Sequence, residues 1–314
     1  MNKKINSTKL LVTSYLDPDL DGFACSFAYA EFLRKNGKDA IAAIFGTPHR
    51  EAEFVLNIFK IHSLQNAETL NYENIILVDT SNLTEVSPKI LPEKVIEIID
   101  HRKLSELHKF PNATSQIELV GSAATLIAEK FYKTDTTISV ESAELLFSAI
   151  VSNTINFKAG VTTIRDHKMA DWLKTKFKIP KDYINKMFAD KSKFKKPLKE
   201  ILNEDVAVFY FNKCSLSILQ LEIINVDDFI KKNLKEIKKI MLEIKKEKSI
   251  GIIFLTCIDL EKSFNLFVVI DKKTQDLLTR IFNSEFKDGV SKRDGILMRK
   301  EITPLIKEMI DKEN

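Results

Sequence analysis

Five acidic or imidazole side chains occur where three apolar runs of the sequence end. Asp19 and Asp21 follow the run LLVTSY in the stretch YLDPDLDG, Asp79 ends IILVD, and Asp100 and His101 end VIEIID. If the runs are strands of a parallel sheet, these side chains meet at the edge where such sheets bind ligands. Carboxylates and an imidazole gathered there repel one another unless a cation neutralises them. Oxygen ligands with one imidazole suit Mn²⁺ or Mg²⁺ better than structural zinc, and two such ions can clamp a phosphoryl group.

The aspartates also allow two other interpretations. The order D-x-D-x-D-G resembles the start of a calcium-binding EF-hand loop, but the twelfth position, where that loop needs a glutamate, is Ala28. Alternatively, Asp19 or Asp21 caps the following helix by accepting hydrogen bonds from its first backbone N–H groups. The capping interpretation explains each aspartate alone, whereas convergence at one edge favours a metal.

The pattern of the first half predicts an α/β fold with a doubly wound parallel sheet. Short apolar runs at residues 10–15, 40–45, 75–79 and 95–100 are typical of strands buried on both faces. Helical patterns occupy the segment after Asp21 and residues 123–132, 142–155 and 165–177. We predict a first domain over residues 1–190.

A smaller α/β domain is predicted over residues 200–314. It follows a lysine-rich connector at residues 174–199, which we interpret as a solvated segment in preference to a phosphate-binding surface. Its strand-like runs are VAVFYF, SLSILQLE, GIIFLTCI and FNLFVVI, and residues 229–248 show a long charged helical pattern. The net charge of +4 does not indicate a nucleic-acid partner, and no apolar run indicates a membrane or export. Three cysteines without metal or redox spacing favour a reducing cytoplasm.

Several motifs together carry a family resemblance. The turn DPDLDG, the VD of IILVDTSN, the DHR of IIDHRK and the helix GSAATLIAEKF resemble the successive motifs of the DHH phosphoesterase superfamily. The branch of manganese-dependent, family II inorganic pyrophosphatases is most similar, and PHREAEFVLNIF, LLFSAIVSNTINFK and GILMRKEITPLI extend the resemblance to nearly the whole chain. The last segment resembles the second type of DHH-associated domain. The resemblance implies an active site in the cleft between two domains, and a homodimer formed through the first.

The resemblance also implies roles for individual residues. Asp19 and Asp21 would each bind one of up to two metal ions, Asp79 would bridge both, and His101 would bind the second. Asp100 would orient the His101 ring or help to shape the site.

Anion binding is implied for basic side chains of both domains. Arg299 and Lys300 match the arginine and lysine that grip substrate phosphates from the second domain, which domain closure brings over the metals. Arg102 stands where the second histidine of DHH is expected, as in prune-like, exopolyphosphatase-related members, and a guanidinium can bind phosphate bidentately.

Other departures affect the predicted metal sites. Tyr15 replaces a metal-binding histidine, Asn153 replaces the last metal-binding aspartate and Ala207 replaces a substrate-binding lysine. Asn153 offers a neutral carbonyl oxygen as a ligand, and Asp17 is an alternative ligand in place of the missing histidine.

We therefore predict a divalent-metal-dependent phosphohydrolase that uses Mn²⁺, or Mg²⁺ or Co²⁺, and metal-bound hydroxide to cleave phosphoanhydride bonds of pyrophosphate or polyphosphate. Its partner would be a small phosphorylated substrate. Two alternatives remain. One is a degenerate DHH protein that binds a phosphorylated ligand with little turnover, because Tyr15 and Asn153 weaken the metal sites. The other is a nucleotide phosphodiesterase, for which the second domain lacks a glycine-rich loop and base-stacking aromatics.

Overall fold

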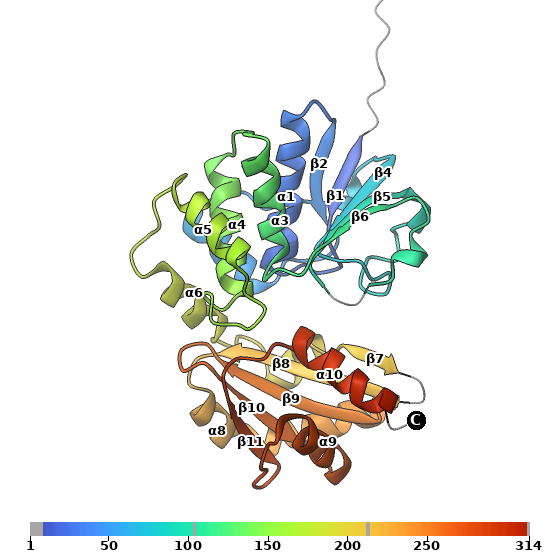
Figure 1. Ribbon diagram of the computed structural model, residues 1–314, viewed down its shortest axis with the longest axis vertical. Helices are drawn as coiled ribbons and strands as arrows, with labels where there is room; N and C mark the ends of the chain where they lie inside the picture. Colours follow the sequence, from blue (N-terminus) through green and yellow to red (C-terminus); the bar gives the residue numbers. More distant parts are fainter. Residues whose placement is uncertain (1–8, 103–104, 212–213, 313–314) are drawn as a thin grey trace, which may run out of the picture. The chain divides into compact units, whose positions relative to one another are not determined.

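The computed structural model describes residues 9–102, 105–211 and 214–312, which form two compact units (Figure 1). The first unit contains the described residues up to Phe157 together with Val161–Met187. The second contains Lys158–Gly160 and the described residues from Phe188 onward. We keep the division near residues 190 and 200 as a proposal for where the chain separates into independently folding domains.

The first unit is built on a six-stranded parallel sheet with the order β3-β2-β1-β4-β5-β6. Its strands are β1 (Leu10–Thr13), β2 (Ala40–Ile44), β3 (Gln65–Asn66), β4 (Asn74–Val78), β5 (Val95–Asp100) and β6 (Thr114–Ile117). The predicted α/β class and parallel sheet are confirmed. The strand order reverses direction between β1 and β4, and this switch point is where open parallel sheets bind ligands.

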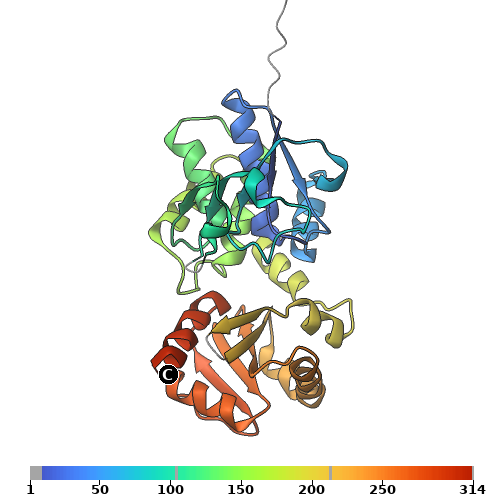
Figure 2. The same cartoon turned by 90° about the vertical axis from the view of Figure 1, so that its right-hand side faces the viewer.

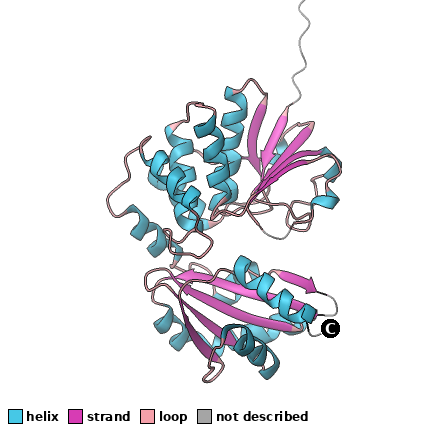
Figure 3. Cartoon of the chain, in the orientation of Figure 1, coloured by secondary structure: helices cyan, strands magenta, loops and turns pink. Residues whose placement is uncertain are grey.

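A layer of helices lies against one face of this sheet (Figure 3). The helices of the first unit are α1 (Leu20–Lys35), α2 (Arg50–Phe59), α3 (Ala123–Lys133), α4 (Val140–Asn153) and α5 (Ile164–Lys174). Helix α1 packs on β1 and β2 and contacts both α3 and α4. It is therefore the central helix of the layer, and its first turn carries Asp21.

The core on the other face of the sheet is formed by short 3₁₀ turns and loops instead of a second helical layer. Val86, Ile90 and Phe110 are buried side chains of these segments that pack on the sheet. These turns are η1 (Ala67–Thr69), η2 (Pro92–Lys94) and η3 (Leu107–Lys109). The described residues thus differ from the doubly wound arrangement that we predicted. Pro88 and Pro92 interrupt the connection between β4 and β5, which prevents a long crossover helix there.

The second unit contains a five-stranded mixed sheet with the order β11-β10-β9-β8-β7. Its strands are β7 (Val208–Phe211), β8 (Cys214–Ile223), β9 (Ile252–Asp259), β10 (Phe264–Val269) and β11 (Val290–Asp294), of which only β8 and β9 pair in parallel among the described residues. Helix α6 (Tyr183–Lys191) crosses the division between the units. The other helices of the second unit are α7 (Leu198–Glu204), α8 (Val226–Glu247), α9 (Lys272–Phe282) and α10 (Arg299–Lys312).

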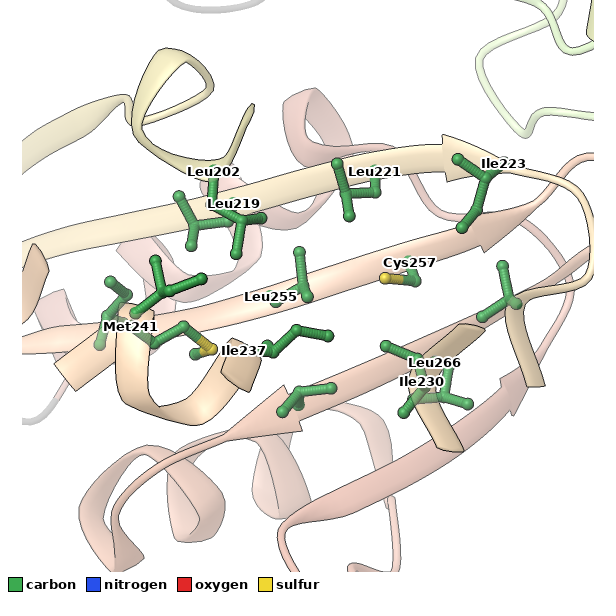
Figure 4. Close-up of a cluster of buried hydrophobic side chains, with 14 of the residues drawn as sticks. Leu202, Leu219, Leu221, Ile223, Ile230, Ile237, Met241, Leu255, Cys257 and Leu266 are labelled. Atoms are coloured by element: carbon green, nitrogen blue, oxygen red, sulfur yellow. The ribbon is translucent and has the colours of Figure 1, made fainter. Parts of the chain in front are cut away.

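Helix α8 covers one face of this sheet and helices α9 and α10 cover the other (Figure 2). Although α8 is rich in lysine, Ile230, Ile237 and Met241 recur at helical spacing and pack on Leu255 and Cys257 of β9 (Figure 4). On the other face, Ile302 and Ile306 of α10 pack with Phe254 and Phe267. Within the part of the chain that the structure describes, no helix is both long and apolar enough to span a membrane.

Candidate metal centre

The predicted acidic residues lie at the carboxyl ends of three neighbouring strands. Asp79 directly follows β4, Asp100 is the last residue of β5 with His101 next, and Asp19 ends the turn from β1 into α1. Strands β1, β4 and β5 are adjacent in the sheet. Strand order thus brings residues that are up to 82 positions apart in the sequence to one edge, where they can act together.

Three of these residues form a tight cluster. One ligand atom each from Asp21, Asp79 and His101 lies within 4.8 Å of the others, and all three side chains are buried. The His101 Nε2 atom is 3.3 Å from Asp79 Oδ1 and 3.8 Å from Asp21 Oδ2. We call these three residues the ligand triad. It contains two hard oxygen ligands and one imidazole nitrogen, a donor set that fits Mn²⁺ or Mg²⁺.

The orientation of the His101 ring is fixed by a backbone carbonyl. Nδ1 lies 3.0 Å from the carbonyl oxygen of Val120. Because a carbonyl only accepts hydrogen bonds, Nδ1 must carry the proton, and in the neutral ring Nε2 presents its lone pair to the two carboxylates. Three electron-rich ligand atoms therefore face one small volume, an arrangement that a cation stabilises.

Asp79 is held by its backbone as well as by its neighbours. Its N–H donates to the Ile99 carbonyl at 2.8 Å, and its φ of 59° lies in the left-handed region that aspartate and asparagine tolerate best after glycine. This kink at the end of β4 directs the Asp79 side chain toward the other two triad members, Asp21 and His101.

The carboxylate of Asp21 is seated at the N-terminus of helix α3. It accepts hydrogen bonds from Ser122 Oγ, Ala123 N and Ala124 N, each at 2.9 Å. These donors and the positive end of the helix dipole stabilise the ionised form. Burial and the nearby Asp79 charge act in the opposite direction and raise the pKa of Asp21 to about 7. A bound cation would restore full ionisation.

Asp19 lies outside the ligand triad and caps helix α1. Its Oδ1 accepts hydrogen bonds from the backbone N–H groups of Asp21 and Gly22 at 2.9 and 3.0 Å, as the capping interpretation predicted. Its own N–H donates to the Tyr15 hydroxyl at 3.0 Å. Burial, followed by the charges of Asp19 and Asp79, raises the pKa of Tyr15 well above its usual range, so the phenol stays neutral.

The hydrogen bonds of Asn153 and Asp17 differ from those expected of metal ligands. Asn153, at the end of α4, directs its amide nitrogen Nδ2 to Asp21 Oδ2, so in this structure it is a hydrogen-bond donor to the triad. Asp17 is exposed, and its Oδ1 accepts from the backbone N–H of Thr47 at 2.7 Å. Asp17 therefore ties the turn after β1 to the loop after β2.

Arg102 extends beside the triad. Its guanidinium donates to Glu85 and, through Nη2, to the backbone carbonyl of Asp79 at 3.1 Å, while its Nε is 3.9 Å from Asp100 Oδ1. The guanidinium carbon also lies over the Tyr15 ring, 5.5 Å from its centroid. A fixed positive charge thus stands next to the backbone of one triad member.

Asp100 accepts hydrogen bonds from the backbone beside the triad and from Ser81, whereas the Nδ1 atom of His101 faces Val120 as described above. Its Oδ1 accepts from the His101 backbone N–H at 2.7 Å and its Oδ2 from Ser81 Oγ at 2.6 Å. Of the two roles that the resemblance implied for Asp100, these hydrogen bonds fit shaping of the site, because the Val120 carbonyl takes the ring N–H.

In the second unit, Arg299 begins helix α10 and is tied to its surroundings. Its Nη1 donates to the backbone oxygens of Asp205 and Ile218 and to Asp205 Oδ2, all at 3.0 Å. Its backbone N–H donates to Gln220 Oε1 at 2.6 Å. Lys300 follows it and is half-buried. These contacts give Arg299 a structural role in joining α10 to β8.

We expect Arg299→Met to lower the free energy of unfolding of the second unit by about 1–3 kcal/mol, because Asp205 and two carbonyls lose their shared donor. Urea unfolding followed by circular dichroism measures this. Arg293→Met is the matched control, since Arg293 Nη1 donates only to backbone carbonyls of its own turn among its described hydrogen bonds. Unfolding of Arg299→Met at the wild-type urea concentration would contradict this structural role.

The turn at Val120–Ala124 supplies partners to both His101 and Asp21, although its residues entered the predictions only as part of the motif GSAATLIAEKF, with no role at the site. A local signal existed, because Ser122 directly precedes the helical pattern of α3 and caps it by accepting from Ala124 N. Which distant carboxylate its hydroxyl would meet could not be read from that signal.

Comparison with protein families agrees with this site. Residues 9–150 match the family model described as the DHH family, N-terminal domain. The region includes β1 to β6, α1 to α3 and the whole ligand triad. The amino-terminal part of this chain is therefore a DHH-family domain.

Several relatives are similar to this protein over nearly the whole chain. A Clostridium acetobutylicum protein named "Probable manganese-dependent inorganic pyrophosphatase" is 29% identical over 308 residues, which cover 94% of this chain and 96% of that protein. The crystal structure of a Methanococcus jannaschii protein proposed to be a family II inorganic pyrophosphatase superposes with a TM-score of 0.81 at 27% identity, covering 96% of this chain and 99% of that one. An exopolyphosphatase-related protein from Bacteroides fragilis shares the fold, with a TM-score of 0.50, 16% identity and coverage of 98% and 93%.

Proposed function

We propose that this protein is a divalent-metal-dependent phosphohydrolase that cleaves inorganic pyrophosphate. The observation that carries the proposal is the ligand triad, in which His101 Nε2 faces the carboxylates of Asp21 and Asp79 at the switch point of a parallel sheet. Full-length similarity to proteins named manganese-dependent inorganic pyrophosphatases supports the choice of reaction.

Mn²⁺ is the cation that we propose for the triad, with Mg²⁺ or Co²⁺ as substitutes. A cation held there supplies Lewis acidity, which neutralises phosphate oxygens and lowers the pKa of water. Asp19 could contribute a ligand to a second ion through its other oxygen, since Oδ1 already caps α1. Asn153 could contribute only after its amide rotates, because Nδ2 now faces Asp21. We therefore propose one firmly held ion and up to two in total.

The basic residues are proposed to bind the substrate phosphates. Arg102 is fixed by Glu85 and by the Asp79 carbonyl, so its guanidinium needs little rearrangement to meet phosphate oxygens beside the triad. Arg299 and Lys300 are proposed to contribute from the second unit, as in the pyrophosphatase pattern. Fixed positive charge near the triad would stabilise the negative charge that develops as the phosphoanhydride bond breaks.

The substrate, assembly and location follow from this proposal. We propose a small phosphorylated substrate, pyrophosphate in preference to longer polyphosphate, a homodimer formed through the first unit, and a cytoplasmic location, where pyrophosphate would be met. Size-exclusion chromatography with light scattering tests the dimer directly.

Phosphate release is the test of the function. Purified protein is incubated with pyrophosphate, tripolyphosphate or long-chain polyphosphate and with Mn²⁺, Mg²⁺ or Co²⁺, and bound metal is measured in parallel. We expect Mn²⁺-dependent release that is fastest with pyrophosphate. Metal binding without release from any of the three substrates would overturn the proposed activity, whereas release that is fastest with polyphosphate would overturn only the substrate assignment.

A further inference from the structure

A second buried carboxylate, Asp166, lies behind the ligand triad and takes no part in it. Asp166 is in the first turn of α5, and its side chain is completely buried. Together with Thr163 it forms the capping box of α5. A capping box needs only the hydrogen bonds between its own two residues. Asp166 also accepts hydrogen bonds from Gly121 and from Thr125, which belong to other segments.

Both oxygens of Asp166 are used. The N–H of Gly121 points between them, at 3.1 Å from Oδ1 and 2.9 Å from Oδ2. The hydroxyl of Thr125, in α3, donates to Oδ1 at 2.6 Å, and Thr163 donates its N–H and hydroxyl to Oδ2, each at 2.7 Å. One carboxylate thus joins the start of α5, the turn before α3 and the first turn of α3.

Gly121 packs directly onto this carboxylate. A Cβ atom at Gly121 would lie 2.5 Å from the Thr154 methyl carbon and 3.1 Å from Asp166 Cγ. The backbone of the turn can therefore approach Asp166 and Thr154 this closely only because residue 121 has no side chain. The position of the turn is set by close packing as well as by hydrogen bonds.

The same turn forms hydrogen bonds with two members of the ligand triad, His101 and Asp21. Val120, on one side of Gly121, accepts the Nδ1 proton of His101. Ser122 and the next two residues, on the other side, donate three hydrogen bonds to Asp21. A shift of the turn would therefore rotate the His101 ring and move the Asp21 carboxylate at the same time.

We propose that Asp166 is a positioning residue for the metal centre, which acts by anchoring the Val120–Ala124 turn. The inference rests on the proposed metal site at Asp21, Asp79 and His101. Asp166 does not contact the ligands itself. Its contribution is to restrict the turn to the one position in which His101 Nε2 and Asp21 Oδ2 converge.

Asp166→Asn tests this role with almost no change in volume. An amide keeps one acceptor oxygen and carries no charge. With its nitrogen at Oδ2 it would face the N–H groups of Gly121 and Thr163, and with its nitrogen at Oδ1 it would face the Gly121 N–H and the hydroxyl that Thr125 now donates, so either orientation weakens the anchor of the turn. We expect the Kd for Mn²⁺, measured by titration calorimetry, to rise about 10- to 100-fold, the range for partners that orient metal ligands. We also expect the His101 ring of the metal-free protein, observed by ¹⁵N NMR, to populate both neutral tautomers instead of the Nδ1–H form alone.

Thr163→Val is the matched control. It removes the capping hydroxyl of α5 but leaves the bonds from Gly121 and Thr125 to Asp166, so stability should fall while Mn²⁺ affinity and the tautomer stay as in the wild type. Thr125→Val, which removes the hydroxyl donated from α3, should weaken Mn²⁺ binding in the same direction as Asp166→Asn but by less. It carries the test if Asp166→Asn does not fold.

The outcomes separate this inference from the proposed function. Wild-type Mn²⁺ affinity and a single tautomer in Asp166→Asn, or unchanged affinity in Thr125→Val when Asp166→Asn does not fold, would overturn the positioning role. Mn²⁺ binding by the wild type without pyrophosphate cleavage would overturn the proposed activity and leave the positioning role standing. If the wild type binds no Mn²⁺, the metal site is wrong, and an unchanged tautomer would then overturn the anchoring of His101 as well.

Discussion

Asp79→Asn is expected to reduce Mn²⁺-dependent release of phosphate from pyrophosphate by more than about 100-fold, because changes to residues that only orient metal ligands already cost about 10- to 100-fold. Asp79 is a member of the ligand triad, with Oδ1 3.3 Å from His101 Nε2. Asparagine keeps the size of the side chain and tolerates the left-handed backbone at this position, whereas alanine would add strain. The substitution therefore removes the negative charge with little effect on the fold.

Asp135→Asn is a closely matched control for this experiment. Asp135 is also in the first unit and also has a left-handed backbone, with a φ of 50°, but it is exposed. It should keep wild-type activity and bound Mn²⁺, measured by elemental analysis. Activity of Asp79→Asn within a few-fold of the wild type would contradict the assignment of Asp79 to the metal centre.

Arg102→Ala is expected to lower kcat/KM for pyrophosphate by about 10²- to 10³-fold, the range for loss of one fixed group that stabilises developing charge. Arg102→Lys should recover only part of the loss, because lysine keeps the charge but lacks the planar fork that binds two phosphate oxygens. The Mn²⁺ affinity should change much less than kcat/KM, since Arg102 contacts the Asp79 backbone and not its ligand oxygens among the hydrogen bonds described above.

Arg34→Ala controls for loss of an arginine that binds a backbone carbonyl. Arg34 is exposed, lies in the last turn of α1 at the opposite end from Asp21, and donates to the Ala40 carbonyl at 3.1 Å. It should leave kcat/KM unchanged. A fall in thermal stability of Arg102→Ala with unaltered kcat/KM would show instead that Arg102 serves only to pair with Glu85 and Asp100.

Much of the first unit could be predicted from sequence because its signals are local. The apolar runs that predicted strands at residues 75–79 and 95–100 correspond to β4 and β5 within one residue. The second unit was predicted less completely. Helices α9 and α10 and strand β11 were not identified. For β11 the reason is that it is polar and partly exposed, and that its pairing with β10 depends on residues 22 to 30 positions away.

The sequence by itself determined which residues reach the ligand edge, since a polar residue that directly follows a buried strand must lie at that strand's carboxyl end. Tertiary structure decided what each of them contacts there. Asp19 turns toward its own helix, whereas Asp21, only two positions later, meets Ser122 from 101 residues away. The contacts of each carboxylate depend on how α1 and α3 pack and on Asp166, which holds the Val120–Ala124 turn at the start of α3. No pattern of neighbouring residues could specify these contacts.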